Sequence, residues 1–280
     1  MQGITLYIPT KDSGRTIKRC LSSILRLSLK PSEILIIDAG SKDGTVRIVR
    51  SIKSKIPLQI IRQDRPGLAA ARNIALEHAK FDLVASLDSD CVAEERWLGI
   101  LWNELQSGAA MASGMVEEDG IDLFSRWRSR HMRQHWGSAR CSPRFLFGAN
   151  TLLSRKAIGK LKYDEQFISN YEDVDFSGKL TQQGLSMIYA PSARVIHIRQ
   201  DNIDTLAETY HRWSFNAWPK PYTVSGLIKK EMSNAYTVFR MLLSDIADPE
   251  LAIIDIKIFF ILANLDTKLH GSHSLNGGRQ

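Results

Sequence analysis

Two carboxylates stand two residues apart at the end of an apolar run, in the stretch FDLVASLDSDCV at residues 81–92. In an extended chain, residues i and i+2 point to the same side, so Asp88 and Asp90 would lie side by side. Two adjacent carboxylates repel each other unless a cation holds them together. Asp and Ser are also ordinary turn residues, so the pair taken alone is equally compatible with a solvated turn.

The elements that lead to this pair favour a site. The first hundred residues alternate between apolar runs typical of buried strands and segments with apolar residues at helical spacing. The predicted strands are 3–10, 32–38, 58–63 and 81–88, and the predicted helices between them are 14–27, 46–55 and 67–79. Such repetition predicts right-handed crossovers and an open α/β sheet, which binds ligands beyond the carboxyl ends of its strands. Asp38 and Asp88 both stand at such ends.

Composition sets broad limits on the protein class. The 280 residues suit one large domain, or one domain with an appended lobe, and the 44% hydrophobic and 24% charged shares are those of a soluble globular protein. Three scattered cysteines favour a reducing compartment over a disulfide framework. We expect a cytoplasmic protein, because no signal peptide or long uncharged apolar run is evident. The net charge of +7 suits phosphate-bearing substrates, nucleic acid or an anionic membrane surface.

Seven stretches spread over residues 3–198 carry a resemblance to a known family. In chain order they are ITLYIPTKDSGRTIKRCLSSIL, EILIIDAGSKDGT, GLAAARNIAL, LVASLDSD, FGANTLLSRKAI, YDEQFISNYEDVDFSGKLTQQG and IYAPSARVIH. Together they resemble the family-two glycosyltransferases with the GT-A fold. The resemblance implies a mixed, Rossmann-like sheet flanked by helices. It divides the chain into a nucleotide-sugar half at 1–115, an acceptor-side half at 116–200 and a mainly helical extension at 201–280.

The same resemblance implies an activity and a cofactor. Members transfer a sugar from a nucleotide-diphosphate donor to an acceptor hydroxyl with inversion, here in cell-surface glycan or glycolipid synthesis. Asp88 and Asp90 are similar to the family's Asp-x-Asp motif, which holds Mn²⁺ or Mg²⁺ against the diphosphate, and so the cation would arrive with the donor. His197 stands where some members supply a histidine to the metal; otherwise it is a packed or solvent-facing histidine.

Further positions are expected to bind the donor because they match family motifs. The implied set is Pro9, Lys11, Asp38, Arg72, Asp88 and Asn150. Arg72 is otherwise a helix-surface cation, and Gly148, Ala149 and Asn150 resemble the turn that lines the donor sugar. Ala39 replaces a second acid that is common in the family, and Lys11 replaces a common aromatic residue. The resemblance therefore does not identify the nucleotide base.

The expected catalytic base lies in NYEDVDF at 170–176. An inverting transfer needs a carboxylate to take the proton of the attacking hydroxyl, and crowding or burial would raise the pKa of such a group toward useful basicity. In the family the base is usually the Asp of this Glu-Asp pair, which implies Asp173, with Glu172 as its rival or as an acceptor-orienting residue. The alternative is a helix N-terminus, where acids are favoured without any chemistry.

The rest of the chain leaves alternatives open. Residues 124–145 mix six arginines with two tryptophans, which suits either a phosphate of a lipid-linked acceptor or membrane headgroup, or a solvated helix; we expect no nucleic acid. Two helices are predicted at 223–244 and 250–268. Residues 251–265 could pack on the core, self-associate into a homo-oligomer, or touch the inner face of a membrane, with packing favoured. Two other functions stay open: a non-catalytic sugar-nucleotide or glycan-binding relative, and a nucleotidyltransferase.

Overall fold

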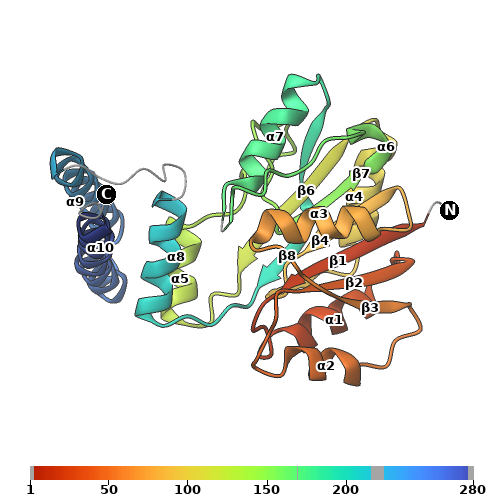
Figure 1. Ribbon diagram of the computed structural model, residues 1–280, viewed down its shortest axis with the longest axis horizontal. Coiled ribbons are helices and arrows are strands. Elements are labelled where there is room, and N and C mark those ends of the chain that lie inside the picture. The colour runs from red at the N-terminus through yellow and green to blue at the C-terminus, as the bar shows by residue number, and fades with distance from the viewer. Residues whose placement is uncertain (1–2, 169, 216–223, 277–280) are drawn as a thin grey trace. The chain divides into compact units, whose positions relative to one another are not determined.

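The structure is a computed structural model that describes residues 3–168, 170–215 and 224–276 (Figure 1). The chain divides into two compact units: Met1–Asp119 with Arg133–Arg199, and Gly120–Met132 with Gln200–Gln280. The second unit thus takes in a short segment near residue 125 as well as the C-terminal residues. The three-segment division expected from the sequence remains a prediction.

The first unit is built on one eight-stranded sheet. Its strands follow the order β3-β2-β1-β4-β7-β6-β8-β5. The predicted strands of the first hundred residues form the parallel part, namely β1 (Ile4–Thr10), β2 (Glu33–Asp38), β3 (Leu58–Arg62) and β4 (Leu83–Leu87). The other four are β5 (Cys91–Ala93), β6 (Met111–Glu118), β7 (Asn150–Ser154) and β8 (Met187–His197). Strand β7 is antiparallel to β4 and β6, which makes the sheet mixed, as expected.

Helices cover both faces of this sheet (Figure 1). The core on one face includes apolar residues of α1 (Ile17–Arg26), α2 (Thr45–Ser51) and α4 (Trp97–Gln106). The core on the other face includes those of α3 (Leu68–His78), α6 (Arg155–Ile158) and α7 (Glu172–Gln182). Buried strands at the centre explain the near-continuous apolar runs, since β2 is buried at all six of its residues. The predicted helices of the first hundred residues are confirmed with slightly shorter bounds.

The second unit consists of helices. They are α5 (Leu123–His131), α8 (Ile203–Phe215), α9 (Val224–Ser244) and α10 (Pro249–Asn276), which confirms the two helices expected near the C-terminus. Trp127, Leu206, Val238 and Ile258, one residue from each helix, belong to a single core. None of the helices in the described part of the chain is long and apolar enough to cross a membrane.

The arginines of α5 form ion pairs inside this unit, while Trp127 is buried and His131 packs against it, as the solvated-helix alternative expects. The phosphate-binding alternative for residues 124–145 stays a prediction. Arg126 pairs with Asp248 at 2.6 Å, Arg128 with Asp201, and Arg130 with Asp245 at 2.7 Å. The sequence could not show this, because the partner acids lie more than seventy residues further along the chain. The ion pairs hold α5 in place.

A buried cluster completes this network. His131 Nε2 lies 2.8 Å from Asp245 and 3.9 Å from Asp255, and the ligand atoms of the three side chains lie within 4.8 Å of one another, a spacing that a metal ion could bridge. Trp127 donates to Asp255 at 2.7 Å, and Arg130 balances the charge of Asp245. These partners hold both carboxylates in place, whereas Asp255 Oδ2 is buried and makes no hydrogen bond among the described residues.

Candidate functional site

The register of the parallel strands puts the predicted donor residues at one edge of the sheet. Thr10, the last residue of β1, is paired with Asp38, the last of β2, and Asp88 follows the end of β4 directly. Ser13 and Ser89, in the loops after β1 and β4, have hydroxyl oxygens 2.7 Å apart. The loops that carry Lys11 and the Asp88–Asp90 pair are therefore in contact beyond the carboxyl ends of the strands.

His197 joins this edge through the other half of the sheet. It ends β8, where it is paired with Cys91 of β5 and with Glu118 of β6. Its Nε2 lies 3.2 Å from Asp90 Oδ2, and its Nδ1 lies 2.8 Å from Glu118 Oε1. An ionised carboxylate can only accept, so Nδ1 donates to Glu118 and Nε2 is turned toward Asp90. A histidine held this way has the arrangement of a metal ligand with its orienting carboxylate.

The charges in this group are strongly coupled. Burial alone would raise the pKa of Asp90, but His197 lowers it to about 2. Burial alone would lower the pKa of His197, but Asp90 and Glu118 raise it to about 10. Without another cation, the histidine is thus protonated and serves as the counter-ion of Asp90. A divalent ion could take over that role by replacing the proton on Nε2.

Asp88 is a buried carboxylate with an oxygen that lacks a hydrogen-bond partner among the described residues. Burial, the largest effect, raises the pKa of Asp88 to about 6; Arg72 opposes the shift, while Asp90 and Glu172 add to it. One of its carboxylate oxygens, Oδ1, is buried and makes no hydrogen bond among the described residues. An orphaned buried carboxylate oxygen is costly, and a divalent cation would satisfy it. The chemistry of Asp88, Asp90 and His197 therefore suits a divalent ion, and their role as its ligands remains a prediction.

Two consecutive residues connect this acidic edge to the predicted base. Asn150, the first residue of β7, is paired with Leu87 of β4. The residue before it, Ala149, therefore lies opposite Asp88, and the Ala149 carbonyl accepts a hydrogen bond from the Asp88 backbone N–H at 3.0 Å. The backbone N–H of Gly148 donates to Asp173 Oδ2 at 3.0 Å. The predicted metal-binding acid and the predicted base are thereby fixed to the same short segment of chain.

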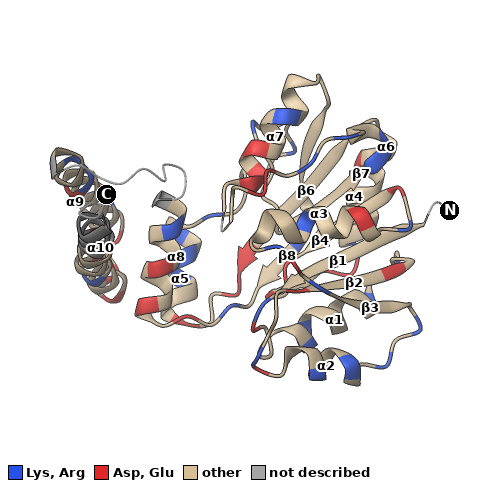
Figure 2. Cartoon of the chain, viewed as in Figure 1, with Lys and Arg blue, Asp and Glu red and all other residues tan. Residues whose placement is uncertain are grey.

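Asp173 lies in the first turn of α7, together with Glu172 and Asp175 (Figure 2). Acids at a helix N-terminus are also favoured without any chemistry, which is the alternative that the sequence left open. Its Oδ1 accepts from the backbone of Val174 at 2.8 Å, so both oxygens are oriented by N–H groups. Burial and then Glu172 raise the pKa of Asp173 to about 6, although Arg72 and the two N–H groups oppose this. The carboxylate is therefore ionised near neutral pH yet more basic than a free aspartate, whose pKa is about 3.9.

Arg72 is not a helix-surface cation, because it is 1% exposed. Its Nε donates to Glu172 at 3.1 Å, and Nη1 donates to Tyr7, Ser86 and the Gly148 carbonyl at 2.9–3.2 Å. The guanidinium thus joins strands β1 and β4, the segment before β7 and helix α7. A donor contact remains a prediction; the structure places Arg72 as the counter-ion and orienting partner of Glu172.

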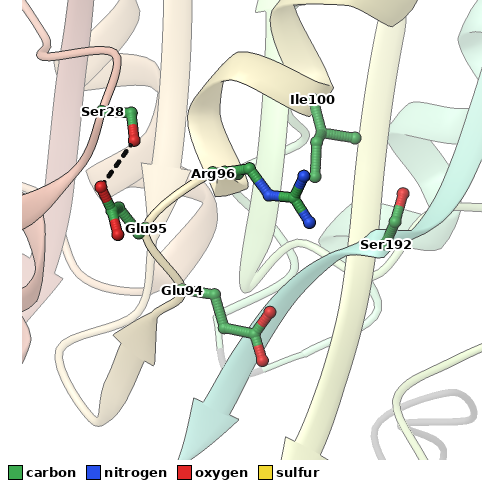
Figure 3. Close-up of a pocket in the computed structure, with 6 residues that line it drawn as sticks. All are labelled: Ser28, Glu94, Glu95, Arg96, Ile100 and Ser192. Atoms are coloured by element: carbon green, nitrogen blue, oxygen red, sulfur yellow. Dashed lines mark hydrogen bonds between the residues drawn. The ribbon is translucent and has the colours of Figure 1, made fainter.

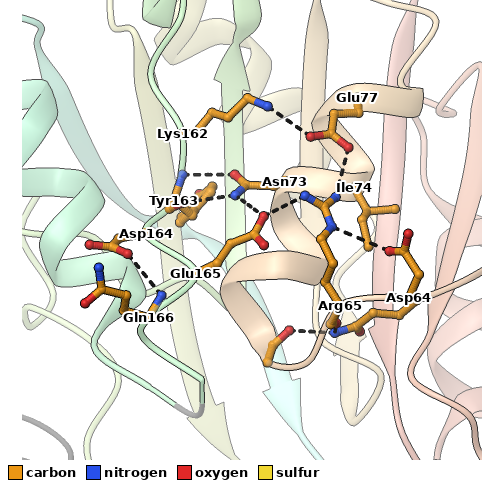
Figure 4. Close-up of polar contacts among 12 residues, drawn as sticks. Asp64, Arg65, Asn73, Ile74, Glu77, Lys162, Tyr163, Asp164, Glu165 and Gln166 are labelled. Carbon is orange, nitrogen blue, oxygen red and sulfur yellow. Dashed lines mark hydrogen bonds and ion pairs between the residues drawn. The ribbon is translucent and has the colours of Figure 1, made fainter.

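A second set of polar contacts brings these distant segments together (Figure 4). Asn73, next to Arg72 on α3, exchanges two hydrogen bonds of 2.9 Å with the backbone of Tyr163. Arg65 pairs with Glu165 at 2.8 Å and with Glu77 at 2.9 Å. These bonds attach the segment before α7 to α3, which explains how Arg72 and Glu172 meet although one hundred residues separate them.

The remaining donor residues differ in their surroundings. Lys11 is exposed and Pro9 is half-buried at the end of β1. Asp38 is 6% exposed, and its carboxylate accepts from the backbone of Gly40 at 3.1 Å and of Ser41 at 3.2 Å. Asp38 therefore shapes its own turn, and its contact with a ribose stays a prediction.

The side chain of Asn150 is buried inside the sheet and bonds to residues other than Asp38, Asp88 and Asp90. It is fully buried, its Oδ1 accepts from Trp97, and its Nδ2 donates to the carbonyls of Met115 and Ala193 at 3.1 and 3.0 Å. Because these bonds occupy its side chain inside the sheet, the structure supports a positioning role for Asn150 and gives no support to the predicted donor contact. Trp97 and Asn150 are 53 residues apart, and so the sequence pattern did not reveal the pair.

Two functional candidates were missed in the sequence. Glu118 orients His197, and Tyr7 accepts a hydrogen bond from Arg72. Glu117 and Glu118 follow an apolar run, MASGMV, so the strand-end pattern could have pointed to this pair of acids. Tyr7 lies inside an apolar strand and gives no comparable signal.

Two open pockets lie away from this group. One, of about 440 Å³, is lined by Ser28, Glu94, Glu95, Arg96, Ile100 and Ser192 (Figure 3). The other, of about 640 Å³, lies between α2 and β3. None of the predicted catalytic, donor or metal residues lines either pocket, so neither is part of the candidate site.

Gly148 provides a test of the segment that holds both acids. A Cβ built on it would lie 2.3 Å from Arg72 Nη2 and 2.7 Å from Cζ, and the guanidinium cannot move away without losing buried hydrogen bonds. We expect Gly148→Ala to destabilise the fold by about 1–3 kcal/mol and to abolish activity. Gly178→Ala is the matched control, because nothing lies within 4 Å of that position in α7 and alanine favours helices. Thermal unfolding of both variants makes the comparison; equal stability would contradict the packing described.

Comparison with known proteins connects this site to a family. The sequence pattern of "Glycosyl transferase family 2" matches residues 5–163. The chain is 31% identical to glycosyltransferase AglE of Haloferax volcanii over 124 residues, covering 43% of this chain and 37% of that protein. It is 24% identical to a poly-β-1,6-N-acetyl-D-glucosamine synthase of Staphylococcus aureus over 226 residues, covering 76% of this chain and 54% of that protein. The chain thus spans about half or less of the length of these relatives.

Solved structures share the fold. A mannosyltransferase of Pyrobaculum calidifontis, in complex with GDP-Man and Mn²⁺, aligns with a TM-score of 0.59 at 18% identity, over 100% of this chain and 76% of that chain. GalNAc-T7 with UDP, GalNAc and Mn²⁺ aligns with the same TM-score and identity, over 71% of this chain and 44% of that chain. These similarities confirm the GT-A fold expected from the sequence. Because the family pattern spans more than half of its residues, the chain belongs to glycosyl transferase family 2.

Proposed function

We propose that this protein is an inverting, divalent-metal-dependent glycosyltransferase that moves a sugar from a nucleotide-diphosphate donor to an acceptor hydroxyl. The proposal rests on the segment Gly148-Ala149. The N–H of Gly148 donates to the Asp173 carboxylate, and the carbonyl of Ala149 accepts from the backbone N–H of Asp88. Inverting transfer needs a base close to the donor's diphosphate site. The name of one relative, a poly-β-1,6-N-acetyl-D-glucosamine synthase, supports a glycan acceptor. Cell-surface glycan or glycolipid synthesis is the process that we propose.

The chain's own residues supply the proton transfer. Asp173, held by two N–H groups, accepts the proton of the acceptor hydroxyl while that oxygen attacks the anomeric carbon. One C–O bond forms as the bond to the diphosphate breaks, and the nucleoside diphosphate leaves from the opposite face, which inverts the configuration. Glu172 is held by Arg72 beside the base, where it helps to raise the pKa of Asp173.

The leaving group is the second requirement. Asp88, Asp90 and His197 would hold Mn²⁺ or Mg²⁺, which when bound neutralises charge that develops on the departing diphosphate. Glu118 keeps His197 turned toward Asp90, so that Nε2 faces the ion. The donor itself would lie along the loops after β1, β2 and β4, near Pro9, Lys11 and Asp38.

A thermal-shift panel of nucleotide sugars, each with and without Mn²⁺, tests this function. We expect one donor to raise the melting temperature only in the presence of metal, because the ion would hold the diphosphate. The shift should be measurable, since a ligand at 100 times its Kd stabilises a protein by about 2.7 kcal/mol. Donor binding with no transfer to any acceptor would favour the non-catalytic alternative. Release of pyrophosphate from a sugar phosphate and a nucleoside triphosphate would favour the nucleotidyltransferase.

The raised pKa of Asp173 predicts a pH dependence. The base works only when ionised, so at saturating donor and metal we expect kcat to rise with pH through an apparent pKa of about 6 and then level off. Below that pKa the rate should fall about tenfold per pH unit. A kcat that stays constant down to pH 5 would remove Asp173 from the role of base.

A further inference from the structure

Helix α9 carries a line of large apolar side chains on its outer side. They are Ile228, Met232, Tyr236, Phe239 and Leu243, which we call the outer stripe, and they are between 55% and 69% exposed. Their spacing of three or four residues places them along one side of the helix. Ile246, just beyond the end of α9, is 76% exposed. Contiguous apolar surface of this kind usually marks an interaction site.

The outer stripe lies opposite the side of α9 that packs in its own unit. Asn234, Val238 and Met241 are buried, the last two in the core that they share with Leu251 and Ile254 of α10. Successive residues turn by about 100° around a helix, so these positions lie about half a turn away from the stripe. The residues of the outer stripe therefore do not belong to the core of this unit.

The charges of α9 indicate the chemistry of a partner. Lys229 and Arg240 are exposed, and the flank of the outer stripe on which both lie carries no acid. The helix has a single carboxylate, Glu231, which is half-buried and interacts with Asn234 and Asp266. On α10, the exposed residues Ile253, Ile256 and Phe260 accompany an exposed lysine, Lys257. Each of the two helices thus exposes apolar side chains together with at least one cation.

We propose that the outer stripe binds an anionic lipid surface. The apolar side chains would enter the boundary between headgroups and acyl chains, while Lys229 and Arg240 meet lipid phosphates. A second copy of the chain is the weaker occupant, because two outer stripes would bring together cations with no carboxylate to neutralise them. The outer stripe lies on α9, outside both segments expected from the sequence, 124–145 and 251–265.

Co-sedimentation with vesicles tests the proposal. We expect the full chain to bind vesicles of phosphatidylcholine containing phosphatidylglycerol, to bind pure phosphatidylcholine far less, and to be released by raised salt. Phe239→Glu with Leu243→Glu should weaken binding by about tenfold or more, because it places charge in the stripe. Lys229→Glu with Arg240→Glu should weaken it by a similar factor without altering the apolar side chains.

A charge-matched control separates this surface from the general basicity of the chain. Lys18 and Arg19 are exposed on α1, so Lys18→Glu with Arg19→Glu changes the net charge equally and should leave vesicle binding unchanged. Equal loss in the control, or no binding to anionic vesicles, would overturn the proposal. A wild-type dimer that either α9 variant converts to a monomer, with no vesicle binding, would assign the stripe to a second copy. Melting temperatures within a few degrees of wild type verify that each variant is folded. These outcomes do not depend on glycosyl transfer.

Discussion

Asp173→Asn should lower kcat by about 10²–10⁴-fold while donor affinity changes little. The substitution keeps the size of the side chain and one acceptor oxygen, which can accept from one of the two N–H groups of Gly148 and Val174. It removes the basic oxygen that receives the hydroxyl proton, and general-base catalysis contributes about that factor. Single-turnover transfer at saturating donor measures the rate, and calorimetric titration of the donor measures binding.

The neighbouring acid distinguishes the base from its rival. Glu172→Gln should also impair the enzyme, but partly through stability, because it leaves the buried guanidinium of Arg72 without its charged partner. A variant with intact stability, intact donor affinity and lost transfer is expected only at Asp173. If Asp173→Asn transferred sugar at the wild-type rate, the base would have to be sought elsewhere.

Asp90→Ala should abolish metal-dependent donor binding and lower kcat/KM by about a hundredfold or more. Asp90 is the partner of His197 Nε2, so its removal takes away one predicted ligand and the charge that turns the histidine toward the ion. The thermal shift produced by donor with Mn²⁺ should fall to the value measured without metal.

A surface acid gives the control for this variant. Asp64 has a side chain that is 80% exposed, and its one ion pair with a described residue is that of 3.5 Å with Arg65. Asp64→Ala removes the same charge from the chain and should leave both the metal-dependent shift and the rate unchanged. Metal-dependent donor binding that survives in Asp90→Ala would contradict the assignment of Asp90 as a ligand.

The fold and the acidic edge could be predicted because their signals are local. Buried parallel strands leave continuous apolar runs, such as EILIID, and a carboxylate after such a run lies at the binding edge of the sheet. Asp38 and Asp88 follow that rule, and the pair Glu117 and Glu118 also follows an apolar run. These inferences need only the neighbours in sequence.

The roles of other residues depend on contacts that no local pattern contains. Arg72 meets Glu172 across one hundred residues, and Arg130 meets Asp245 across 115, so their burial and pairing emerge only in the folded chain. Asn150 matches a family position, yet its side chain serves the sheet and is fully buried. The outer stripe of α9 appears in the sequence as part of an apolar helix, and only the folded structure shows that Val238 and Met241 are buried while the stripe is exposed.

Anomalous diffraction from crystals grown with Mn²⁺ and a nucleoside diphosphate tests the central claim most directly. The account predicts a manganese peak within about 2.5 Å of carboxylate oxygens of Asp88 or Asp90, with the diphosphate bound to the ion and Gly148-Ala149 beside it. A peak at His131, Asp245 and Asp255, or a nucleotide bound away from the strand ends, would contradict it.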